Sequence, residues 1–321
     1  MLEGHSRMHR TGWLKAAIAA AVTASVFTLA ACGQFTPTYL KPLSAKTRAM
    51  LAEKGMTEES PILVRIFKAE SELEVWKQKD DGRFYHFKTY PICDWSGKLG
   101  PKVDKGDRQT PEGFYLVDEG QMNPKSKYHL AFNVGFPNAY DRSLGRSGGD
   151  IMVHGDCKSA GCFAMTDAVV EEIYILAREA LGGGQTEFQL QAYPFRMTAA
   201  NMAQHKDDKW YGFWQNIKEG YDYFEVTHLP VKVNVCDHRY VINASFSATP
   251  DPNSACPSYQ RLPVIAAPKE SKQQQAKAEI PPTKPLGSVL GLTFGPAKPV
   301  YQAFTLGPAT PTLPMSPAPK K

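Results

Sequence analysis

Residues 151–165 read IMVHGDCKSAGCFAM, and this stretch holds the densest group of reactive side chains in the chain. The apolar residues in front of His154 predict a strand that carries this imidazole to its end. A loop punctuated by glycines then leads to Cys162, and Thr166 or Asp167 can cap a helix that starts just after it. The pattern therefore predicts a strand, a loop and a helix that together present a histidine and a cysteine.

This pair of side chains is typical of nucleophilic catalysis. The thiolate of Cys162 is a strong nucleophile, and the imidazole of His154 can take its proton and later protonate a leaving amine. Gly161 lets the backbone approach a substrate carbonyl, so the amide N–H groups of Gly161 and Cys162 are expected to stabilise the oxyanion. A position just before a helix N-terminus is expected to favour the thiolate.

The stretch also resembles the signature of L,D-transpeptidase catalytic domains of the YkuD type, in which a His-Gly precedes a Ser-His-Gly-Cys. The matching residues here are His154-Gly155 and Ser159-Ala160-Gly161-Cys162. Upstream, residues 110–114 read TPEGF and resemble the Thr-Pro-x-Gly entry to a strand in these domains. The resemblance covers residues 60–195 and, through the stretch from Asp107 to Thr198, is strongest with the YafK-like branch of the family.

The resemblance implies an α+β fold rich in β-structure, with a sandwich-like or barrel-like catalytic domain, and a ping-pong reaction on peptidoglycan without a cofactor. Cys162 would attack an amide formed by meso-diaminopimelate in a stem peptide and give a thioester. An amine of a second stem peptide or a lipoprotein lysine would then accept the acyl group during cell-wall remodelling. In this first hypothesis Cys162 is the nucleophile, His154 is the general acid and base, and Ser159 and Gly161 belong to the same site.

Three departures from the family signature leave two other hypotheses open. Ala160 stands where the family has a histidine, Ala164 stands where it has an arginine, and only eight residues lead from His154 to Cys162. These changes remove an orienting group and a carboxylate clamp but keep the nucleophile and its base. The second hypothesis is therefore an amidase that hydrolyses diaminopimelate-linked bonds and releases wall-attached lipoproteins. The third is a wall-binding lipoprotein without catalytic activity.

Arginines near the reactive stretch are candidates to replace the missing carboxylate clamp. Arg142 and Arg146 lie in a glycine-rich loop before the His154 strand, and Arg196 follows the last strand of the domain. A guanidinium can bind a carboxylate through two parallel hydrogen bonds, so Arg142 and Arg146 are candidates to bind the stem peptide, with Tyr140 as a further contact. A solvated loop charge is the alternative for each arginine.

The first 31 residues have the pattern of a lipoprotein signal peptide. Basic residues precede an uncharged run from Ala16 to Ala31, which is short for a membrane-spanning helix of roughly 20 apolar residues. The run ends in a Leu-Ala-Ala-Cys sequence that resembles a bacterial lipobox, so Cys32 is expected to be lipidated; an ordinary signal peptide is the alternative. Gly33 replaces the aspartate typical of inner-membrane retention. The sequence therefore predicts a periplasmic protein anchored in the outer membrane of a Gram-negative bacterium.

Five cysteines remain when the lipidation candidate Cys32 is set aside. Because five is odd, at least one thiol lacks an intramolecular partner in an oxidising compartment. Cys236 and Cys256 are 20 residues apart and are predicted to form a disulfide. Cys157 is predicted to be structural, with Cys93 as its partner.

Other roles for the cysteines of the reactive stretch stay open at this point. Cys157 and Cys162 are close enough in sequence to form a small disulfide-closed loop, and Cys157 is also a nucleophile candidate on chemical grounds. A zinc ion bound by these two cysteines with His154 and Asp156 would need ligand spacings unlike the usual patterns. No metal site is therefore predicted.

Short strand candidates recur between residues 62 and 193. They are Ile62–Phe67, Glu74–Trp76, Phe84–Thr89, Gly113–Asp118, His129–Val134, Asp150–His154 and Phe188–Tyr193. Their spacing favours a β-sandwich or barrel over alternating βαβ units. A helix capped by Thr166 or Asp167 is expected to end at residues 182–184, with one apolar face packed on the sheet.

These patterns divide the chain into five parts. They are a signal peptide (1–31), a tether (32–60) with a short helical stretch around residues 45–54, a catalytic domain (61–195), a small, partly helical C-terminal lobe (196–260) and a tail (261–321). The tail holds 12 of the 25 prolines and is predicted to be disordered. It contains eight Lys or Arg and two acidic residues, so it accounts for the net charge of +5 of the whole chain. The predicted partners are peptidoglycan, wall-linked lipoproteins and the membrane, and no nucleic acid.

Overall fold

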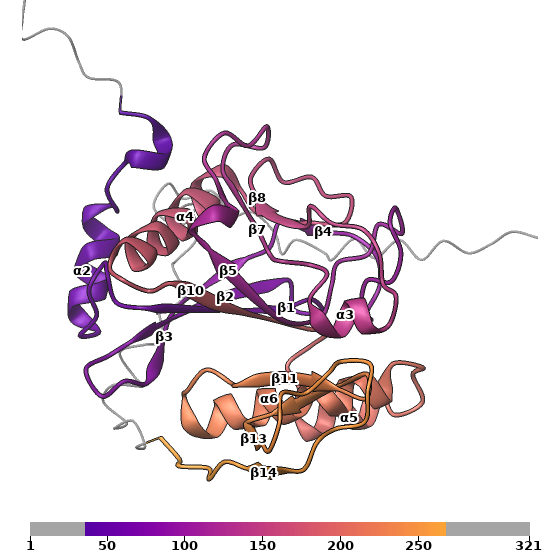
Figure 1. Cartoon of the computed structure of the whole chain (residues 1–321). Coiled ribbons are helices and arrows are strands. Elements are labelled where there is room, and N and C mark those ends of the chain that lie inside the picture. The colour runs from indigo at the N-terminus through magenta and orange to yellow at the C-terminus, as the bar shows by residue number, and fades with distance from the viewer. Residues whose placement is uncertain (1–35, 268–321) are drawn as a thin grey trace, which may run out of the picture. The chain divides into compact units, whose positions relative to one another are not determined.

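A computed structural model of the chain describes residues 36–267, and its centre is a five-stranded sheet with the strand order β3-β2-β1-β10-β5 (Figure 1). These strands are β1 (Ile62–Phe67), β2 (Glu72–Gln78), β3 (Phe84–Pro91), β5 (Gly113–Asp118) and β10 (Glu187–Tyr193). The strands β1 and β10 are parallel, and the other neighbours are antiparallel. All five overlap strands predicted from the sequence.

The strand β1 is buried along its whole length, which explains its unbroken apolar sequence. Val64 and Ile66 face the main core, whereas Leu63 packs with Phe224 of the C-terminal lobe on the other face. A strand covered on both faces loses the usual alternation of polar and apolar residues. The central sheet is thus the middle layer of the molecule.

A second five-stranded sheet packs on one face of the first and contains the reactive stretch. Its order is β4-β9-β8-β7-β6, and β8 and β9 are parallel. The strands are β4 (Asp94–Trp95), β6 (Met122–Asn123), β7 (Ala131–Asn133), β8 (Met152–His154) and β9 (Phe163–Ala164). Phe132 of β7 meets Phe188 of β10 with the ring centroids 5.7 Å apart, so the two sheets share one core.

The helix α4 (Asp167–Gly182) lies on the same face of the central sheet (Figure 1). The hydroxyl of its N-cap, Thr166, accepts a hydrogen bond from the Val169 N–H at 3.3 Å, as expected for a capping threonine. Its buried residues recur at helical spacing and join the core between the two sheets. The mixed architecture confirms the predicted α+β class.

The segment predicted as a tether is packed against the domain over its described part. It contains η1 (Thr38–Leu40) and α2 (Ala45–Glu53), and Leu43, Leu51 and Met56 are buried in the main core. Arg178 of α4 also donates a hydrogen bond to the Lys41 carbonyl. The helix α2 matches the helical stretch predicted around residues 45–54. The segment is packed on the domain, because apolar side chains spaced along it join the core.

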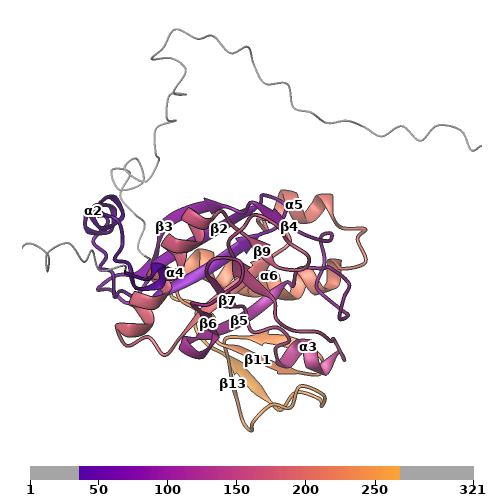
Figure 2. The ribbon, with the colours of Figure 1, turned by 90° about the horizontal axis from the view of Figure 1, so that it is seen from above.

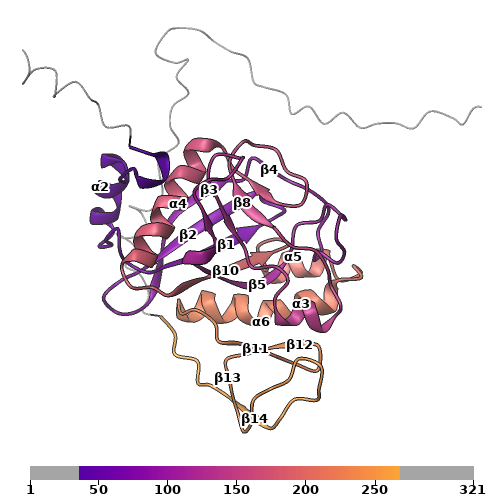
Figure 3. The ribbon, with the colours of Figure 1, turned by 45° about the horizontal axis from the view of Figure 1, so that its top comes forward.

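The C-terminal lobe covers the other face of the central sheet (Figures 1 and 3). It contains α5 (Ala199–Gln204), α6 (Tyr211–Thr227), β11 (Val233–Cys236), β12 (Arg239–Ile242), β13 (Ala244–Phe246) and β14 (Tyr259–Arg261). Aromatic residues of α6 pack against Phe67, Phe114 and Tyr193 of the sheet, so the aromatic cluster of residues 210–224 is largely core. Two hairpins complete the lobe, and Figure 2 shows β11 near the short helix α3 (Ala139–Ser143).

The boundary predicted between lobe and tail is placed too early. Arg261 ends β14, donates a hydrogen bond to the Ile242 carbonyl and forms an ion pair with Glu219. Lipidation at Cys32, the signal peptide and the tail from residue 268 onward lie outside the described residues. Among residues 36–267, no helix is both long and apolar enough to cross a membrane.

Candidate active site

His154 ends β8, and Cys162 directly precedes β9, the parallel neighbour of β8. His154 pairs with Ala164 and Val153 pairs with Phe163, so the same register places Cys162 opposite Met152. The Met152 N–H, two residues before His154 on β8, donates a hydrogen bond to the Cys162 Sγ at 3.4 Å. The fold therefore brings together the two residues that the sequence singles out.

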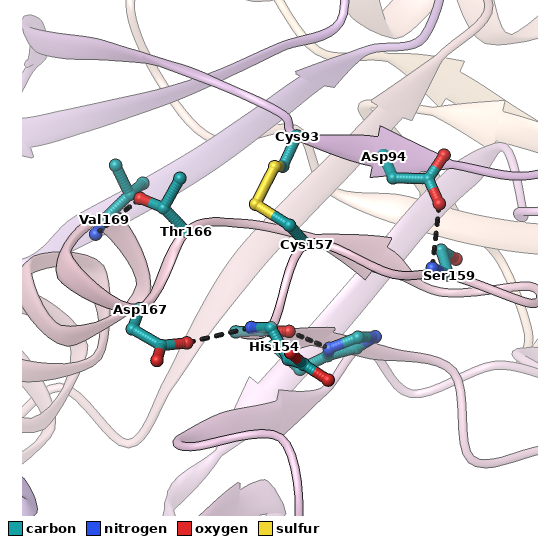
Figure 4. The surroundings of a disulfide bond; sticks show 10 residues. Cys93, Asp94, His154, Cys157, Ser159, Thr166, Asp167 and Val169 are labelled. Atoms are coloured by element: carbon teal, nitrogen blue, oxygen red, sulfur yellow. Dashed lines mark hydrogen bonds between the residues drawn. A yellow bond between two sulfur atoms is a disulfide. The ribbon is translucent and has the colours of Figure 1, made fainter.

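The imidazole of His154 is held in one orientation. Its Nδ1 lies 2.6 Å from the carbonyl oxygen of Gly155 (Figure 4). The centroid of the Tyr128 ring lies 4.9 Å from that of the imidazole. A carbonyl oxygen can only accept, so Nδ1 must carry the proton, and Nε2 keeps its lone pair. His154 is thus arranged as a base, oriented by a backbone group that side-chain motifs cannot reveal.

The backbone at Gly155 leaves no room for a side chain. A Cβ at this position would lie 2.5 Å from an Asp167 carboxylate oxygen and 3.0 Å from the Tyr128 carbonyl oxygen. The same Asp167 oxygen accepts a hydrogen bond from the Asp156 N–H at 2.9 Å (Figure 4). The His-Gly turn is therefore packed tightly against the start of α4.

Cys162 is the only free cysteine among the described residues. Its Sγ accepts a hydrogen bond from the Met152 N–H at 3.4 Å and donates one to the Asp150 carbonyl at 3.6 Å. Within the described part of the chain it has no hydrogen bond to His154, as is common for catalytic pairs without substrate.

The expected stabilisation of the thiolate is wrong for this state. The pKa of the Cys162 thiol is raised, mainly by burial and also by the negative charge of Asp150. The Met152 N–H and the charge of Lys102 act in the opposite direction but do not offset burial. Burial disfavours the charged thiolate, and this outweighs any help from the helix that starts at Asp167. The resting thiol is protonated, so attack requires a base.

Ser159 organises the turn before the nucleophile. Its Oγ accepts hydrogen bonds from the N–H groups of Gly161 at 3.3 Å and Cys162 at 2.9 Å, and donates one to the Cys162 carbonyl. These N–H groups were the predicted oxyanion donors, but in this state the serine hydroxyl occupies both. Gly161 has a φ of +127°, which favours glycine.

A disulfide joins Cys157 to Cys93, beside β4 (Figure 4). Next to it, the Asp94 carboxylate accepts a hydrogen bond from the Ser159 N–H at 2.9 Å. Cys157 is therefore neither a nucleophile nor a partner of Cys162, and it cannot be a zinc ligand. Both links hold the loop between His154 and Cys162 against the second sheet.

The remaining two described cysteines form a disulfide within the C-terminal lobe. Cys236 at the end of β11 is bonded to Cys256, and both are part of a small apolar cluster with Val241 and Ala244. Neither residue lines the pocket that contains Cys162. This disulfide therefore stabilises the lobe rather than the site.

Three cations line the pocket beside Cys162, which has a volume of about 530 Å³. Lys102, Lys105 and Arg108 come from the loop before β5, and Asp150 is the acidic residue among the lining residues. Sequence reasoning missed these three cations as site residues. The signal was present in the alternation of Lys102, Lys105 and Arg108 with glycine and aspartate, close before the TPEGF motif.

The arginines predicted to bind substrate lie elsewhere. Arg146 is buried, forms a 2.8 Å ion pair with Asp141, and its guanidinium lies over the Tyr140 ring. Tyr140 is itself buried against Tyr240, and Arg142 donates to the Pro137 carbonyl in a separate groove. None of the three predicted residues lines the Cys162 pocket. Tyr140 and Arg146 instead pack on the ring of Phe213 in the C-terminal lobe.

Arg196 is paired with carboxylates of the central sheet. Its guanidinium forms ion pairs with Glu72 at 2.6 Å and Glu74 at 2.7 Å on β2. It also lies over the ring of Phe67, 4.3 Å from the centroid. This arginine therefore joins the end of the catalytic domain to the central sheet.

Comparisons with known proteins identify the family to which this fold and site belong. Residues 62–181 match the L,D-transpeptidase catalytic domain, YkuD. The chain is also 46% identical over 188 residues to the Escherichia coli K12 protein named "Putative L,D-transpeptidase YafK", covering 59% of this chain and 76% of that protein. The chain belongs to the YkuD family of L,D-transpeptidase catalytic domains, as its motifs indicated.

Solved structures show weaker likeness. The helical cell shape determining protein Pgp2 from Campylobacter jejuni is 22% identical, with a TM-score of 0.35, and the match covers 56% of this chain and 68% of that chain. Bd1075 from Bdellovibrio bacteriovorus is 18% identical, with a TM-score of 0.29, and the match covers 50% of this chain and 56% of that chain.

Proposed function

We propose that the protein is a cysteine-dependent L,D-transpeptidase that acts on peptidoglycan stem peptides. The observation that carries this proposal is the site itself. Cys162 is the free thiol among the described residues, it lines a pocket, and its sulfur is bonded to the Met152 N–H of β8, the strand that ends at His154. The hydrogen bond from Nδ1 to the Gly155 carbonyl leaves Nε2 of His154 as the base.

The reaction has two halves with the same proton carrier. Nε2 of His154 takes the thiol proton, the Cys162 sulfur bonds to the diaminopimelate carbonyl carbon, and the C–N bond to the leaving amine breaks as His154 returns the proton. An acceptor amine then attacks the thioester carbonyl and its proton passes to His154. The C–S bond breaks, and His154 returns the proton to the Cys162 thiolate. Because burial keeps the resting thiol protonated, His154 is essential to the first half.

The decisive experiment incubates the purified protein with disaccharide tetrapeptides and an amine acceptor. We expect dimeric products and an acyl adduct on Cys162 in the mass spectrum of the stopped reaction. Cys162→Ala should abolish both while sacculus binding persists. His154→Asn should lower turnover at least 100-fold, whereas the control His238→Asn, at an exposed residue of the C-terminal lobe, should not change it. Wall binding without product in the wild type would favour a non-catalytic lipoprotein.

Hydrolysis is the second candidate reaction, and the composition of the pocket favours it. Ala160 lines the pocket where the family signature has a histidine, and Ala164 replaces the arginine. The small side chain of Ala160 leaves room for water beside Cys162. An amidase of this kind would release wall-attached lipoproteins. Products that incorporate oxygen from ¹⁸O-water, with no dimers in the presence of excess amine, would establish the amidase and exclude the transpeptidase.

We also propose that Cys32 carries a lipid anchor and that the protein lies in the periplasm at the outer membrane. The lipobox-like end of the N-terminal apolar run supports the anchor. Two disulfides support an oxidising compartment. Labelling with radioactive palmitate should mark the wild type but not Cys32→Ala. An unlabelled wild type in the membrane fraction would contradict the lipid anchor.

A further inference from the structure

We infer that Lys105 and Arg108 determine substrate specificity by binding a free carboxylate beside Cys162, in place of the arginine that the family has at position 164. The inference rests on the proposed function. It assigns to the pocket a ligand with a free amino acid end, which in the proposed substrate is the unlinked end of diaminopimelate.

The loop from Lys102 to Arg108 is firmly attached next to the nucleophile. The Ser147 N–H donates to the Val103 carbonyl at 2.9 Å, and the Lys105 N–H donates to the Ser147 hydroxyl at 3.1 Å. The Arg108 Cα lies 3.9 Å from where a Cβ on Gly161 would be. The loop cations therefore border the residue that precedes Cys162.

The three cations differ in their availability for a ligand. Lys102 is buried, and its ammonium is paired with Asp107 and bonded to the Asp104 carbonyl. The Asp107 carboxylate also accepts hydrogen bonds from three backbone N–H groups of the same loop. Lys105 and Arg108 are exposed, and no ion pair to either is present among residues 36–267. They are the cations that a carboxylate can reach.

One acidic residue completes the chemistry of the pocket. Asp150 lines it together with Lys105 and Arg108, so two available cations face one carboxylate. A ligand that carries both a carboxylate and an ammonium group matches this arrangement. A free amino acid end has this pair of charges on one carbon atom, whereas an amidated end has lost the negative charge.

The family's own position for a carboxylate clamp is not available here. Residue 164 is alanine, and it is completely buried in β9 opposite His154. Lys105 and Arg108 line the pocket with Cys162, whereas Ala164 does not. A guanidinium can bind a carboxylate through two hydrogen bonds, and a lysine adds a point charge.

The test uses two synthetic stem peptides that differ only in the diaminopimelate carboxylate, which is free in one and a carboxamide in the other. The readout is the ratio of their kcat/KM values for cleavage. Two charge-assisted contacts predict that the wild type prefers the free carboxylate by about 10- to 100-fold. The Lys105→Gln/Arg108→Gln double variant should reduce this ratio to about threefold or less. Asp150→Asn, tested with an N-acetylated end, should likewise reduce discrimination.

A matched control is available on α2, where Lys46 and Arg48 are exposed and do not line the pocket. Lys46→Gln/Arg48→Gln should retain the ratio of the wild type. Equal kcat/KM values for the two peptides in the wild type, or an unchanged ratio in the Lys105/Arg108 variant, would overturn the inference while the proposed function stands.

Failure of the proposed function looks different. In that case the wild type forms no Cys162 adduct with either peptide. The pocket is then tested by calorimetric titration of Cys162→Ala with both peptides. Tighter binding of the free carboxylate, lost on substitution of Lys105 and Arg108, supports the inference, and equal binding overturns it.

Discussion

At the scale of single residues, Gly155 is a position where the structure has no room for a side chain. A methyl group there would clash with the Asp167 carboxylate and the Tyr128 carbonyl, and the carbonyl of Gly155 also orients His154. We predict that Gly155→Ala lowers the unfolding free energy by about 1–3 kcal/mol and lowers kcat by about 10- to 100-fold. Chemical denaturation and steady-state kinetics measure the two effects.

A control for this substitution lies at the end of α4. A Cβ on Gly182 would meet no atom within 4 Å, so Gly182→Ala should leave kcat unchanged. It should raise the unfolding free energy by about 0.5–1 kcal/mol, because alanine has less conformational entropy in the unfolded chain. Equal losses of kcat in both variants would show that Gly155 has no special role.

The pKa of Cys162 gives a second prediction at this scale. Burial raises the pKa of its thiol. The reactive thiolate therefore becomes abundant only at a pH above the pKa of an ordinary cysteine. Alkylation by iodoacetamide should therefore be slower at pH 7 than for N-acetylcysteine. The rate should rise about tenfold per pH unit below the pKa and continue to rise above pH 8.5. A plateau below pH 8 would contradict the burial argument.

Single residues also show where sequence reasoning reaches its limit. His154 and Cys162 were predictable because both belong to one short motif whose chemistry is independent of distant contacts. Arg146 and Tyr140 were assigned to substrate only because they precede the His154 strand in sequence. The structure buries both in the lobe interface, since their partners Asp141 and Tyr240 could not be read from local pattern.

At the scale of elements, the two disulfides make different contributions. Cys93–Cys157 spans 64 residues and fixes the loop between His154 and Cys162, whereas Cys236–Cys256 spans 20 residues within the lobe. Loop-closure entropy assigns about 4 and about 3 kcal/mol to them, respectively. We predict that Cys93→Ala/Cys157→Ala lowers both the Tm and kcat, the latter about tenfold or more.

The second disulfide serves as the control in that experiment. Cys236→Ala/Cys256→Ala should lower the Tm but retain kcat when turnover is measured well below the transition. Thermal unfolding followed by circular dichroism, with activity measured at a temperature where both variants are folded, separates the effects. Full activity of the Cys93/Cys157 variant would show that this disulfide is not needed to position the catalytic loop.

Elements were predictable to the extent that their pattern is local. The strands Ile62–Phe67 and Gly113–Asp118 agree residue for residue with the prediction, because apolar runs bounded by turn residues define them. The two-residue strands β4 and β9 were missed, since two residues carry no periodicity. The parallel pairing of β1 with β10 was also missed, because its partners are more than a hundred residues apart.

At the scale of the whole molecule, the C-terminal lobe is linked to the active-site loop through buried charges. Trp214 of α6 donates to one oxygen of Glu112 at 2.8 Å, and the other oxygen accepts from the Gly100 N–H and the Lys68 ammonium. Lys68 also donates to the carbonyls of Gly100 and Thr110. This network fixes both ends of the loop that presents Lys105 and Arg108.

The network predicts that a substitution in the lobe changes substrate selection at a site that it does not touch. Trp214→Phe leaves a carboxylate oxygen of Glu112 without its donor, which should cost about 1–3 kcal/mol of unfolding free energy. It should also reduce the preference for the free-carboxylate peptide, because the ends of the loop lose their fixed position. Trp76→Phe is the matched control, since its indole donates to Glu74 on β2 and not to the network. A loss of preference in Trp214→Phe alone would show that the lobe contributes to substrate specificity by positioning the loop. If both tryptophan variants lose stability and neither changes the preference, the lobe supports the fold without positioning the loop.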